Sequence, residues 1–312
     1  MTAAVPRVAV VIPVHNDRER TLRCLESLAR IDYTAHTPVV VDDGSRDGTA
    51  DAVAERHPGA TVLHGNGNLW WAGATNRGVR HALENGYDFV LTLNNDTLVD
   101  PPFLTHLVNA ALANPRTIVG ARLNFLSRPS CVWALGAVMR WRDGKIFHLL
   151  EQGQEETAPH LQQPELRPVE TLTGCGALIP VDCFRENGYY DARRFPQYHA
   201  DAEFVLRSAK RGWRALVHTR AVVYNDAEHT AADTTTRVFD QLLSRRSAAY
   251  LRPILAIHRD YCPPRLFVAS LAQYYARHFL SRDERLRGLG SVLKALARRF
   301  RKPAAGEGTQ TR

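Results

Sequence analysis

An amide and a carboxylate follow a short apolar run at residues 94–96, where they could bind a hard metal cation. Asn94 and Asp96 flank Asn95, directly after the apolar residues 89–93. Carboxylate and amide oxygens suit Mg²⁺ and Mn²⁺, and such a cation can neutralise charge on a departing diphosphate. The alternative is an Asx turn that closes a strand. Taken alone, the motif slightly favours the turn.

A second acidic cluster follows the apolar residues 38–41. Asp42 and Asp43 could accept hydrogen bonds from a ribose or a base, whereas Asp47 is placed to cap the helix that follows. One of Asp42 and Asp43 is therefore a candidate nucleoside contact, and the sequence leaves the choice between them open.

Small residues in the segment 65–78, GNGNLWWAGATNRG, open a predicted helix. Backbone amides at such a position, with the positive end of the helix dipole, can bind an anion. Arg77 lies one turn into the helix and could add a direct phosphate contact. Trp70 and Trp71 could line a sugar site or fill the core, and both interpretations remain open.

Asp201 is the fourth candidate, in the segment 195–207, FPQYHADAEFVLR. A carboxylate at the start of a helix is often only an N-cap, and Glu203 would stabilise the same first turn by its charge. On these residues alone, capping is the favoured interpretation.

The elements that position these clusters alternate along the first hundred residues. Apolar runs at 8–13, 38–41, 61–63 and 89–93 predict buried strands, and residues 17–30, 49–56 and 72–84 have helical spacing. Such β-α repeats predict a mostly parallel central sheet with helices on both faces. Ligands bind beyond the carboxyl ends of such strands, which is where all four strands lead into polar residues.

The rest of the chain has less regular patterning. A helix is expected near 103–113, strands near 117–120, 132–138 and 215–224, and mainly helices after residue 230. The segment 173–180 contains Gly174 and Gly176, where the backbone could approach a ligand closely.

Composition limits the class of protein. The 312 residues are 45% hydrophobic, enough for a sizeable core. Five cysteines without a C-x-x-C pair argue against a disulfide framework or a zinc knuckle and favour a cytoplasmic location. The N-terminus lacks the features of a signal peptide, and no apolar run reaches the length of a membrane span.

The net charge of +8 is concentrated near the C-terminus. Residues 282–302 carry eight basic side chains interleaved with apolar ones at roughly helical spacing. Such a helix could bind an anionic membrane surface, or it could pack one face on the core and leave the basic face solvated. Both interpretations remain open, and no nucleic-acid-binding motif is recognisable.

In this order and spacing, the motifs resemble those of family 2 inverting glycosyltransferases of the GT-A fold. The resemblance covers residues 7–226 and rests on VVIPVHN (10–16), VVVDDGSRDGT (39–49), GNLWWAGATNRG (67–78), LTLNNDT (91–97), TGCGALIP (173–180) and DAEFVLRSAKRGW (201–213). Each motif is weak alone, but the ordered set is specific. The resemblance implies a Rossmann-like GT-A fold, and the patterning after residue 230 adds a C-terminal helical extension.

The resemblance also implies residue roles, with departures. Asp42 or Asp43 would bind the nucleoside, and the family's D-x-D motif falls on Asn94 and Asp96, so Asp96 would carry the main charge. Asp201 would be the catalytic base, although Ala200 replaces the usual preceding Glu.

Relatives often carry a metal-binding His after a segment like residues 221–224, AVVY. This chain has Asn225 there and His229 four residues later. Three alternatives remain open: Asn225 ligates the metal, His229 reaches it, or the ligand is missing.

The expected protein is a glycosyltransferase that uses Mg²⁺ or Mn²⁺, with a dTDP- or UDP-linked sugar donor, dTDP-rhamnose among them, and a glycan or lipid-linked acceptor in surface polysaccharide synthesis. It would be cytoplasmic and peripheral at the inner face of the cell membrane. The main alternative function is that of a non-catalytic nucleotide-sugar-binding protein. A phosphotransferase is disfavoured because the sequence lacks the motifs of that class. The expected donor-binding residues are Pro13, Asn16, Asp42, Asp43, Asn68, Trp71, Asn76, Arg77 and Asn95.

This interpretation also divides the chain. Residues 1–100 would form the nucleotide-sugar-binding half of the GT-A domain and residues 101–230 the acceptor-binding half. Residues 231–302 would form a basic helical extension, and residues 303–312 a disordered tail.

Overall fold

The computed structural model describes residues 4–162, 164–226 and 238–280. Contacts divide the chain into two compact units, one of Met1–Met139 with Phe147–Thr230 and the other of Arg140–Ile146 with Ala231–Arg312. The predictions for His229 and for residues 282–312 lie outside the described residues.

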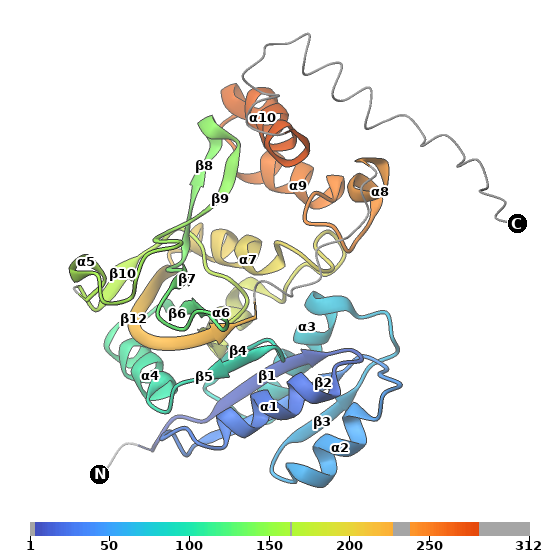
Figure 1. Ribbon diagram of the computed structural model, residues 1–312, viewed down its shortest axis with the longest axis vertical. Coiled ribbons are helices and arrows are strands. Elements are labelled where there is room, and N and C mark those ends of the chain that lie inside the picture. Colours follow the sequence, from blue (N-terminus) through green and yellow to red (C-terminus); the bar gives the residue numbers. More distant parts are fainter. Residues whose placement is uncertain (1–3, 163, 227–237, 281–312) are drawn as a thin grey trace, which may run out of the picture. The chain divides into compact units, whose positions relative to one another are not determined.

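The first unit is built on a ten-stranded sheet (Figure 1). Its main order is β10-β12-β6-β11-β4-β1-β2-β3, with β5 paired to β12 and β7 to β6. The strands of this sheet are β1 (Val8–Val14), β2 (His36–Asp42), β3 (Thr61–His64), β4 (Phe89–Thr92), β5 (Thr97–Val99), β6 (Thr117–Phe125), β7 (Val132–Ala134), β10 (Leu166–Pro168), β11 (Ala177–Pro180) and β12 (Arg214–Asn225). β8 (Ala137–Arg140) and β9 (Lys145–Leu149) form a separate two-stranded sheet.

The helices of the first unit are α1 (Arg18–Leu28), α2 (Thr49–Arg56), α3 (Trp70–Glu84), α4 (Phe103–Ala113), α5 (Pro159–Gln162), α6 (Val181–Asn187) and α7 (Ala200–Ala209). The described part of the second unit is helical, with η1 (Trp141–Asp143), α8 (Val238–Leu243), α9 (Leu251–Tyr261), η2 (Pro264–Leu266) and α10 (Phe267–Phe279). None of the helices in these described ranges is both long and apolar enough to cross a bilayer.

The β-branched residues of β1 explain how the sheet acquires two covered faces. Val8, Val10 and Ile12 point into a core that they share with α1, α2 and α4. The alternate residue Val11 faces α3, where Gly78 packs so closely that an added Cβ would come within 2.4 Å of the valine side chain. Because side chains alternate along a strand, a continuous apolar run fills both faces.

The predicted elements of the first hundred residues are all present, and the fold is the predicted mostly parallel α/β sheet. β1 pairs in parallel with β2 and β4, and β2 with β3. Two antiparallel pairings lie beside the site, one of β5 with β12 and one in which β11 inserts between β4 and β6. This insertion carries the segment 173–176 to the carboxyl end of β4.

Candidate active site

The loops after β1 and β2 are joined at one edge of the sheet. Pro13 pairs with Val41 in the β1–β2 register, so both strands end at the same level. Beyond them, the Asn16 N–H donates to Ser45 Oγ at 2.9 Å, and Asn16 Oδ1 accepts the Arg46 N–H at 2.7 Å. Asn16 has a left-handed backbone, with φ of 53°. Pro13 and Asn16 therefore lie at the rim predicted for them.

The two neighbouring aspartates differ in what their carboxylates bind. Asp43 Oδ1 accepts the Gly67 N–H at 2.8 Å, and its Oδ2 accepts the N–H groups of Leu69 at 2.8 Å and Trp70 at 3.2 Å. Asp43 thus orders the loop before α3. Asp42 Oδ1 accepts the Ser45 N–H at 2.8 Å, while its Oδ2 makes no hydrogen bond to any described residue.

Three predicted donor-binding residues lie at or near the start of α3; two are exposed, and the third is hydrogen-bonded within the protein. Asn68 and Arg77 are exposed, as the predicted donor contacts would have to be. Asn76 instead exchanges hydrogen bonds with the backbone of Tyr190, at 2.8 Å to its carbonyl oxygen and 2.9 Å from its N–H. Its side chain ties α3 to the segment that precedes α7.

The motif at 94–96 forms a turn, and two of its side chains are occupied. Asn94 Oδ1 accepts the Trp71 indole N–H at 3.0 Å, and the Asn95 amide donates to Thr21 Oγ1 at 3.2 Å. The Asn94 carbonyl oxygen also accepts the Thr97 hydroxyl at 2.7 Å, which closes the turn. The motif can therefore form a turn and also contribute to a metal site, because the turn uses the side chains of Asn94 and Asn95 but not that of Asp96.

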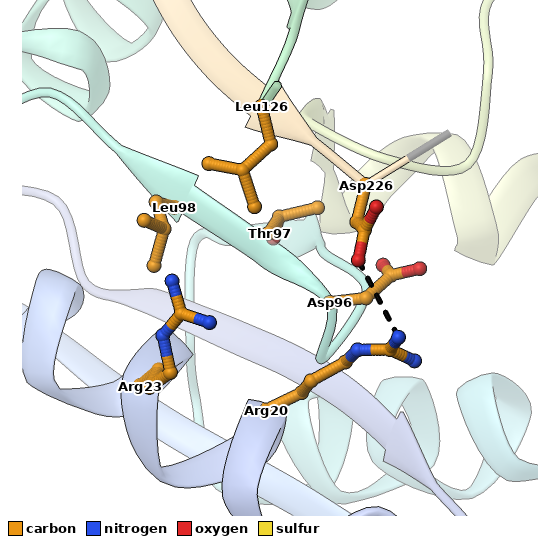
Figure 2. Close-up of a pocket in the computed structure, with 7 residues that line it drawn as sticks. All are labelled: Arg20, Arg23, Asp96, Thr97, Leu98, Leu126 and Asp226. Carbon is orange, nitrogen blue, oxygen red and sulfur yellow. Dashed lines mark ion pairs between the residues drawn. The ribbon is translucent and has the colours of Figure 1, made fainter. Parts of the chain in front are cut away.

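Asp96 lines a pocket with Arg20, Arg23, Thr97, Leu98, Leu126 and Asp226 (Figure 2). The Asp226 N–H lies 3.3 Å from the Asp96 carbonyl oxygen, which sets the two carboxylates side by side. Burial raises the pKa of Asp96 to about 6, and the charge of Asp226 adds to the rise. Asp96 Oδ1 is buried and has no hydrogen-bond partner among the described residues.

Arg20 supplies positive charge to this pocket. Its guanidinium lies 3.4 Å from Asp226 Oδ2 and 3.4 Å from Asp17 Oδ2. In Figure 2 the Arg20–Asp226 ion pair passes beside Asp96. The side chain of Arg20 is 39% exposed, so it can move away from the carboxylates at little cost.

A further buried oxygen lies at the end of β12, on a residue that does not itself line this pocket. Asn225 pairs with Thr97 in the β12–β5 register, directly before Asp226. Its side-chain Oδ1 is buried without a hydrogen-bond partner among the described residues, as is Asp96 Oδ1. Buried oxygens without partners are costly unless something binds them, and a set of oxygens alone suits Mg²⁺ or Mn²⁺.

Asp201 lies in the first turn of α7 and binds two backbone amides. The Gly174 N–H donates to its Oδ2 at 2.5 Å, and the Ala202 N–H donates to its Oδ1 at 2.8 Å. Burial raises the pKa of Asp201, while these two amides and the nearby His199 oppose the rise. The Gly174 bond shows that Asp201 does more than cap its own helix.

Trp71 lies between the Asn94 turn and Asp201. Its indole N–H binds Asn94, and its ring edge meets Tyr190 with centroids 5.4 Å apart. A Cβ added at Gly174 would lie 2.4 Å from the Trp71 ring and 3.2 Å from the Asp201 Cβ. Of the two interpretations of Trp71, this placement favours a site residue over simple core filling.

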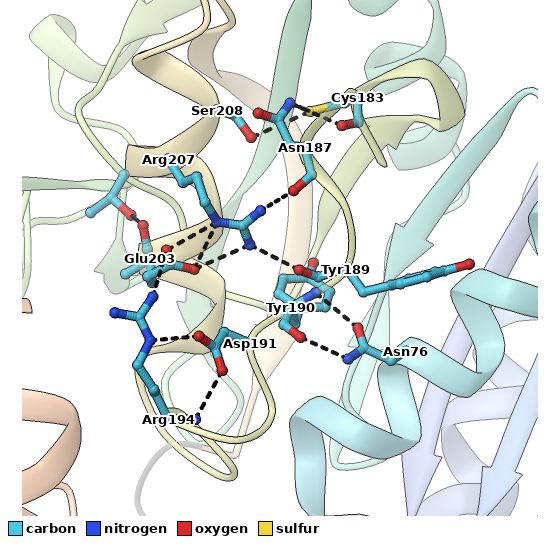
Figure 3. A network of polar contacts seen from close by, with 12 residues as sticks. Asn76, Cys183, Asn187, Tyr189, Tyr190, Asp191, Arg194, Glu203, Arg207 and Ser208 are labelled. Atoms are coloured by element: carbon cyan, nitrogen blue, oxygen red, sulfur yellow. Dashed lines mark hydrogen bonds and ion pairs between the residues drawn. The ribbon is translucent and has the colours of Figure 1, made fainter. Parts of the chain in front are cut away.

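An ionic network around the buried Glu203 holds α7 in place (Figure 3). Glu203 is fully buried, with Arg207 Nε at 3.0 Å and Arg194 at 3.8 Å. Arg207 also donates to the carbonyl oxygens of Asn187 and Tyr189. The base candidate thus stands on a helix that is fixed to the preceding loop.

Sequence reasoning missed Asp226 and Arg20. Asp226 directly follows Asn225 at the end of a strand, and a search for carboxylates at every strand end would have found it. Arg20 carried no such signal, because only the packing of α1 against β5 brings it to the pocket.

Comparisons with known proteins find glycosyltransferases. The sequence model of glycosyl transferase family 2 matches residues 9–160. N-acetylglucosaminyl-diphospho-decaprenol L-rhamnosyltransferase of Mycobacterium tuberculosis is 27% identical over 271 residues, which cover 76% of this chain and 81% of that protein.

Two solved structures share the fold. The mannosyltransferase PcManGT from Pyrobaculum calidifontis, in complex with GDP-Man and Mn²⁺, matches with a TM-score of 0.58 and 22% identity, over 98% of this chain and 77% of its own. GalNAc-T7 with UDP, GalNAc and Mn²⁺ matches with a TM-score of 0.60 and 13% identity, over 88% of this chain and 56% of its own.

Proposed function

We propose that this chain, whose residues 9–160 match the model of glycosyl transferase family 2, transfers a sugar, with inversion, from a nucleotide-sugar donor to a hydroxyl of a glycan or lipid-linked acceptor. One arrangement carries the proposal. The Trp71 indole binds Asn94 in the turn that carries Asp96, and its ring packs against Gly174, whose N–H binds Asp201. The site thus offers oxygens for a cation and, separately, a carboxylate for a proton.

The donor's nucleoside is assigned to Asp42 rather than Asp43. Asp43 uses both oxygens to hold the loop before α3, whereas Asp42 keeps Oδ2 free of hydrogen bonds to described residues. A carboxylate oxygen of this kind can accept a hydrogen bond from a ribose hydroxyl or a base N–H. Asp43 then acts indirectly, by ordering the loop that carries Asn68.

Asp96, Asp226 and Asn225 would hold Mg²⁺ or Mn²⁺, which when bound neutralises charge on the departing diphosphate. Both similar solved structures contain Mn²⁺. The support within this chain is the pair of buried oxygens without hydrogen-bond partners among the described residues, on Asp96 and Asn225. Arg20 would leave Asp226 when the cation enters.

Asp201 is assigned the role of general base. As the acceptor oxygen attacks the anomeric carbon, its proton passes to Asp201 while the bond to the diphosphate breaks on the opposite face. The Gly174 and Ala202 N–H groups each hold one carboxylate oxygen, and the lone pairs that remain on these oxygens can accept the proton. General-base assistance of this kind contributes about 10²–10⁴ in rate.

We propose dTDP-L-rhamnose as the donor to test first. The M. tuberculosis relative is named as an L-rhamnosyltransferase acting on a decaprenol-linked acceptor, and it aligns with most of this chain. A lipid-linked acceptor would also give the basic segment 282–302 a purpose, since anionic membranes attract such segments.

A donor panel tests the proposal. Binding of dTDP-rhamnose, UDP-galactofuranose, UDP-N-acetylglucosamine and GDP-mannose is measured by calorimetry with and without Mn²⁺, followed by transfer to a lipid-linked N-acetylglucosamine acceptor. We expect Mn²⁺-dependent binding of one donor, which is lost in Asp96→Asn, and turnover of that donor. Donor binding that is the same with and without Mn²⁺, or the absence of turnover with every donor, would contradict the proposal.

A further inference from the structure

A second group of metal-ligand side chains lies in the first unit, apart from the candidate active site. His106 of α4, Glu165 before β10 and His218 of β12 each place a ligand atom within 4.8 Å of the other two. His218 lies within β12 opposite Ala121 of β6, and Asn225, directly before Asp226, lies opposite Phe125, four residues or roughly 13 Å further along β6. None of the three residues lines the Asp96 pocket. This cluster is therefore separate from the Asp96 pocket.

Three packed elements hold the cluster together. α4 packs on β12, and β10 pairs antiparallel with β12 at His218 (Figure 1). The Thr219 N–H also donates to the Glu165 carbonyl oxygen at 2.9 Å, which fixes the backbone of Glu165 beside the strand. The rings of His106 and His218 stack with centroids 4.9 Å apart. The two histidines are thus fixed by packing, whereas the Glu165 side chain is 42% exposed and is held beside them through its backbone.

The chemistry of the cluster differs from that of the Asp96 pocket. Two imidazoles and one carboxylate are a typical ligand set for Zn²⁺, with a fourth position left for water, whereas Mg²⁺ and Mn²⁺ prefer oxygens.

Two contacts of Arg220 use atoms that a metal ion would bind, and both contacts can be broken. Arg220 Nε lies 3.5 Å from Glu165 Oε1, but the Arg220 side chain is 57% exposed, so this ion pair is weak. The Arg220 N–H donates to His218 Nδ1 at 3.2 Å, and metal binding at Nε2 would shift the ring proton to Nδ1. The strand register shifts between His218 and Val222, so the backbone here is irregular and can adjust.

We infer that His106, Glu165 and His218 form a Zn²⁺ site that links α4 and the segment before β10 to β12. The site is distinct from the divalent-cation site proposed at Asp96. It would take a borderline transition metal ion through two nitrogens and one carboxylate oxygen.

Zinc binding to the untagged full-length chain tests the inference. Calorimetry and equilibrium dialysis are run in excess Mg²⁺, which occupies the oxygen site, and Co²⁺ is used as a spectroscopic probe. We expect one Zn²⁺ per chain, a rise in Tm, and tetrahedral Co²⁺ absorption bands. His106→Ala and Glu165→Gln should each weaken Zn²⁺ binding by roughly tenfold or more and should remove the Co²⁺ bands.

Two controls separate this site from other sources of binding. His160→Ala removes a surface histidine that pairs with Glu151 at 3.1 Å, and it should leave Zn²⁺ affinity unchanged. The double variant Asp96→Asn with Asp226→Asn should also keep one bound Zn²⁺. The inference is overturned if the wild-type chain takes up no Zn²⁺ in excess Mg²⁺, if His106→Ala binds Zn²⁺ as the wild type does, or if the double variant loses it.

Discussion

Asp42 and Asp43 illustrate what residue identity can and cannot predict. Both follow the same strand, and the sequence made either a candidate for the nucleoside. Only the folded loop distinguishes them, because Asp43 meets backbone amides from residues 67–70, more than twenty positions away. Asp226 could have been found as a carboxylate at a strand end, but its position beside Asp96 follows only from the pairing of β12 with β5.

Asp226 gives the first prediction at this scale. Asp226→Asn removes a charge from the proposed cation site, so we expect the Mn²⁺ concentration for half-maximal activity to rise about tenfold or more. Asp17→Asn is the matched control, because Asp17 pairs with the same Arg20 but does not line the pocket. Equal Mn²⁺ requirements in the two variants would remove Asp226 from the site.

The second prediction concerns pH. Asp201 must be ionised to accept a proton, and burial raises its pKa, so the active form is lost as pH falls through a value above the ordinary aspartate pKa of about 4. We expect the acid limb of kcat/KM to lie above that value. Because His199 lowers the pKa of Asp201, His199→Asn should move the limb to higher pH. A limb that stays in place would show that another group controls it.

At the scale of elements, local patterns predicted the β-α units well because each apolar run carries its own signal. They could not predict the antiparallel insertion of β11, since Ala177 pairs with Thr92 and Gly120 across long stretches of chain. This insertion brings Gly174 to Trp71 and Asp201. The site therefore depends on a pairing that no local pattern contains.

Gly174→Ala tests that contact. The added Cβ would meet the Trp71 ring at 2.4 Å, so Trp71 must shift away from Asn94 and Asp201. We expect a loss of about 1–3 kcal/mol in the free energy of unfolding, as for overpacking, and a clear fall in transfer rate. Gly59→Ala is the control, because nothing lies within 4 Å of its added Cβ. If both variants behave like the wild type, Trp71 does not organise the site.

At the scale of the whole molecule, the ordered set of motifs predicted the fold class and the enzyme class. The comparisons confirm both. Charge distribution is the second property at this scale, since eight basic side chains fall within residues 282–302, outside the described residues. A chain that acts on a lipid-linked acceptor would gain from electrostatic attachment to the membrane.

Deleting residues 282–312 should therefore reduce sedimentation with anionic liposomes, with less effect at high salt, where the charges are screened. Deleting only 303–312 is the control, because that segment contains one Glu and one Arg and so carries no net charge. If the longer deletion sediments as the full chain does, the basic segment is not a membrane anchor.

The most direct test of the whole account is the rate of sugar transfer by Asp201→Asn at saturating donor and acceptor. The change keeps the shape of the side chain and removes its ability to accept the proton. We predict that Mn²⁺-dependent donor binding persists while kcat falls by about 10²–10⁴. Transfer near the wild-type rate, with donor binding intact, would contradict the assignment of Asp201 as the base.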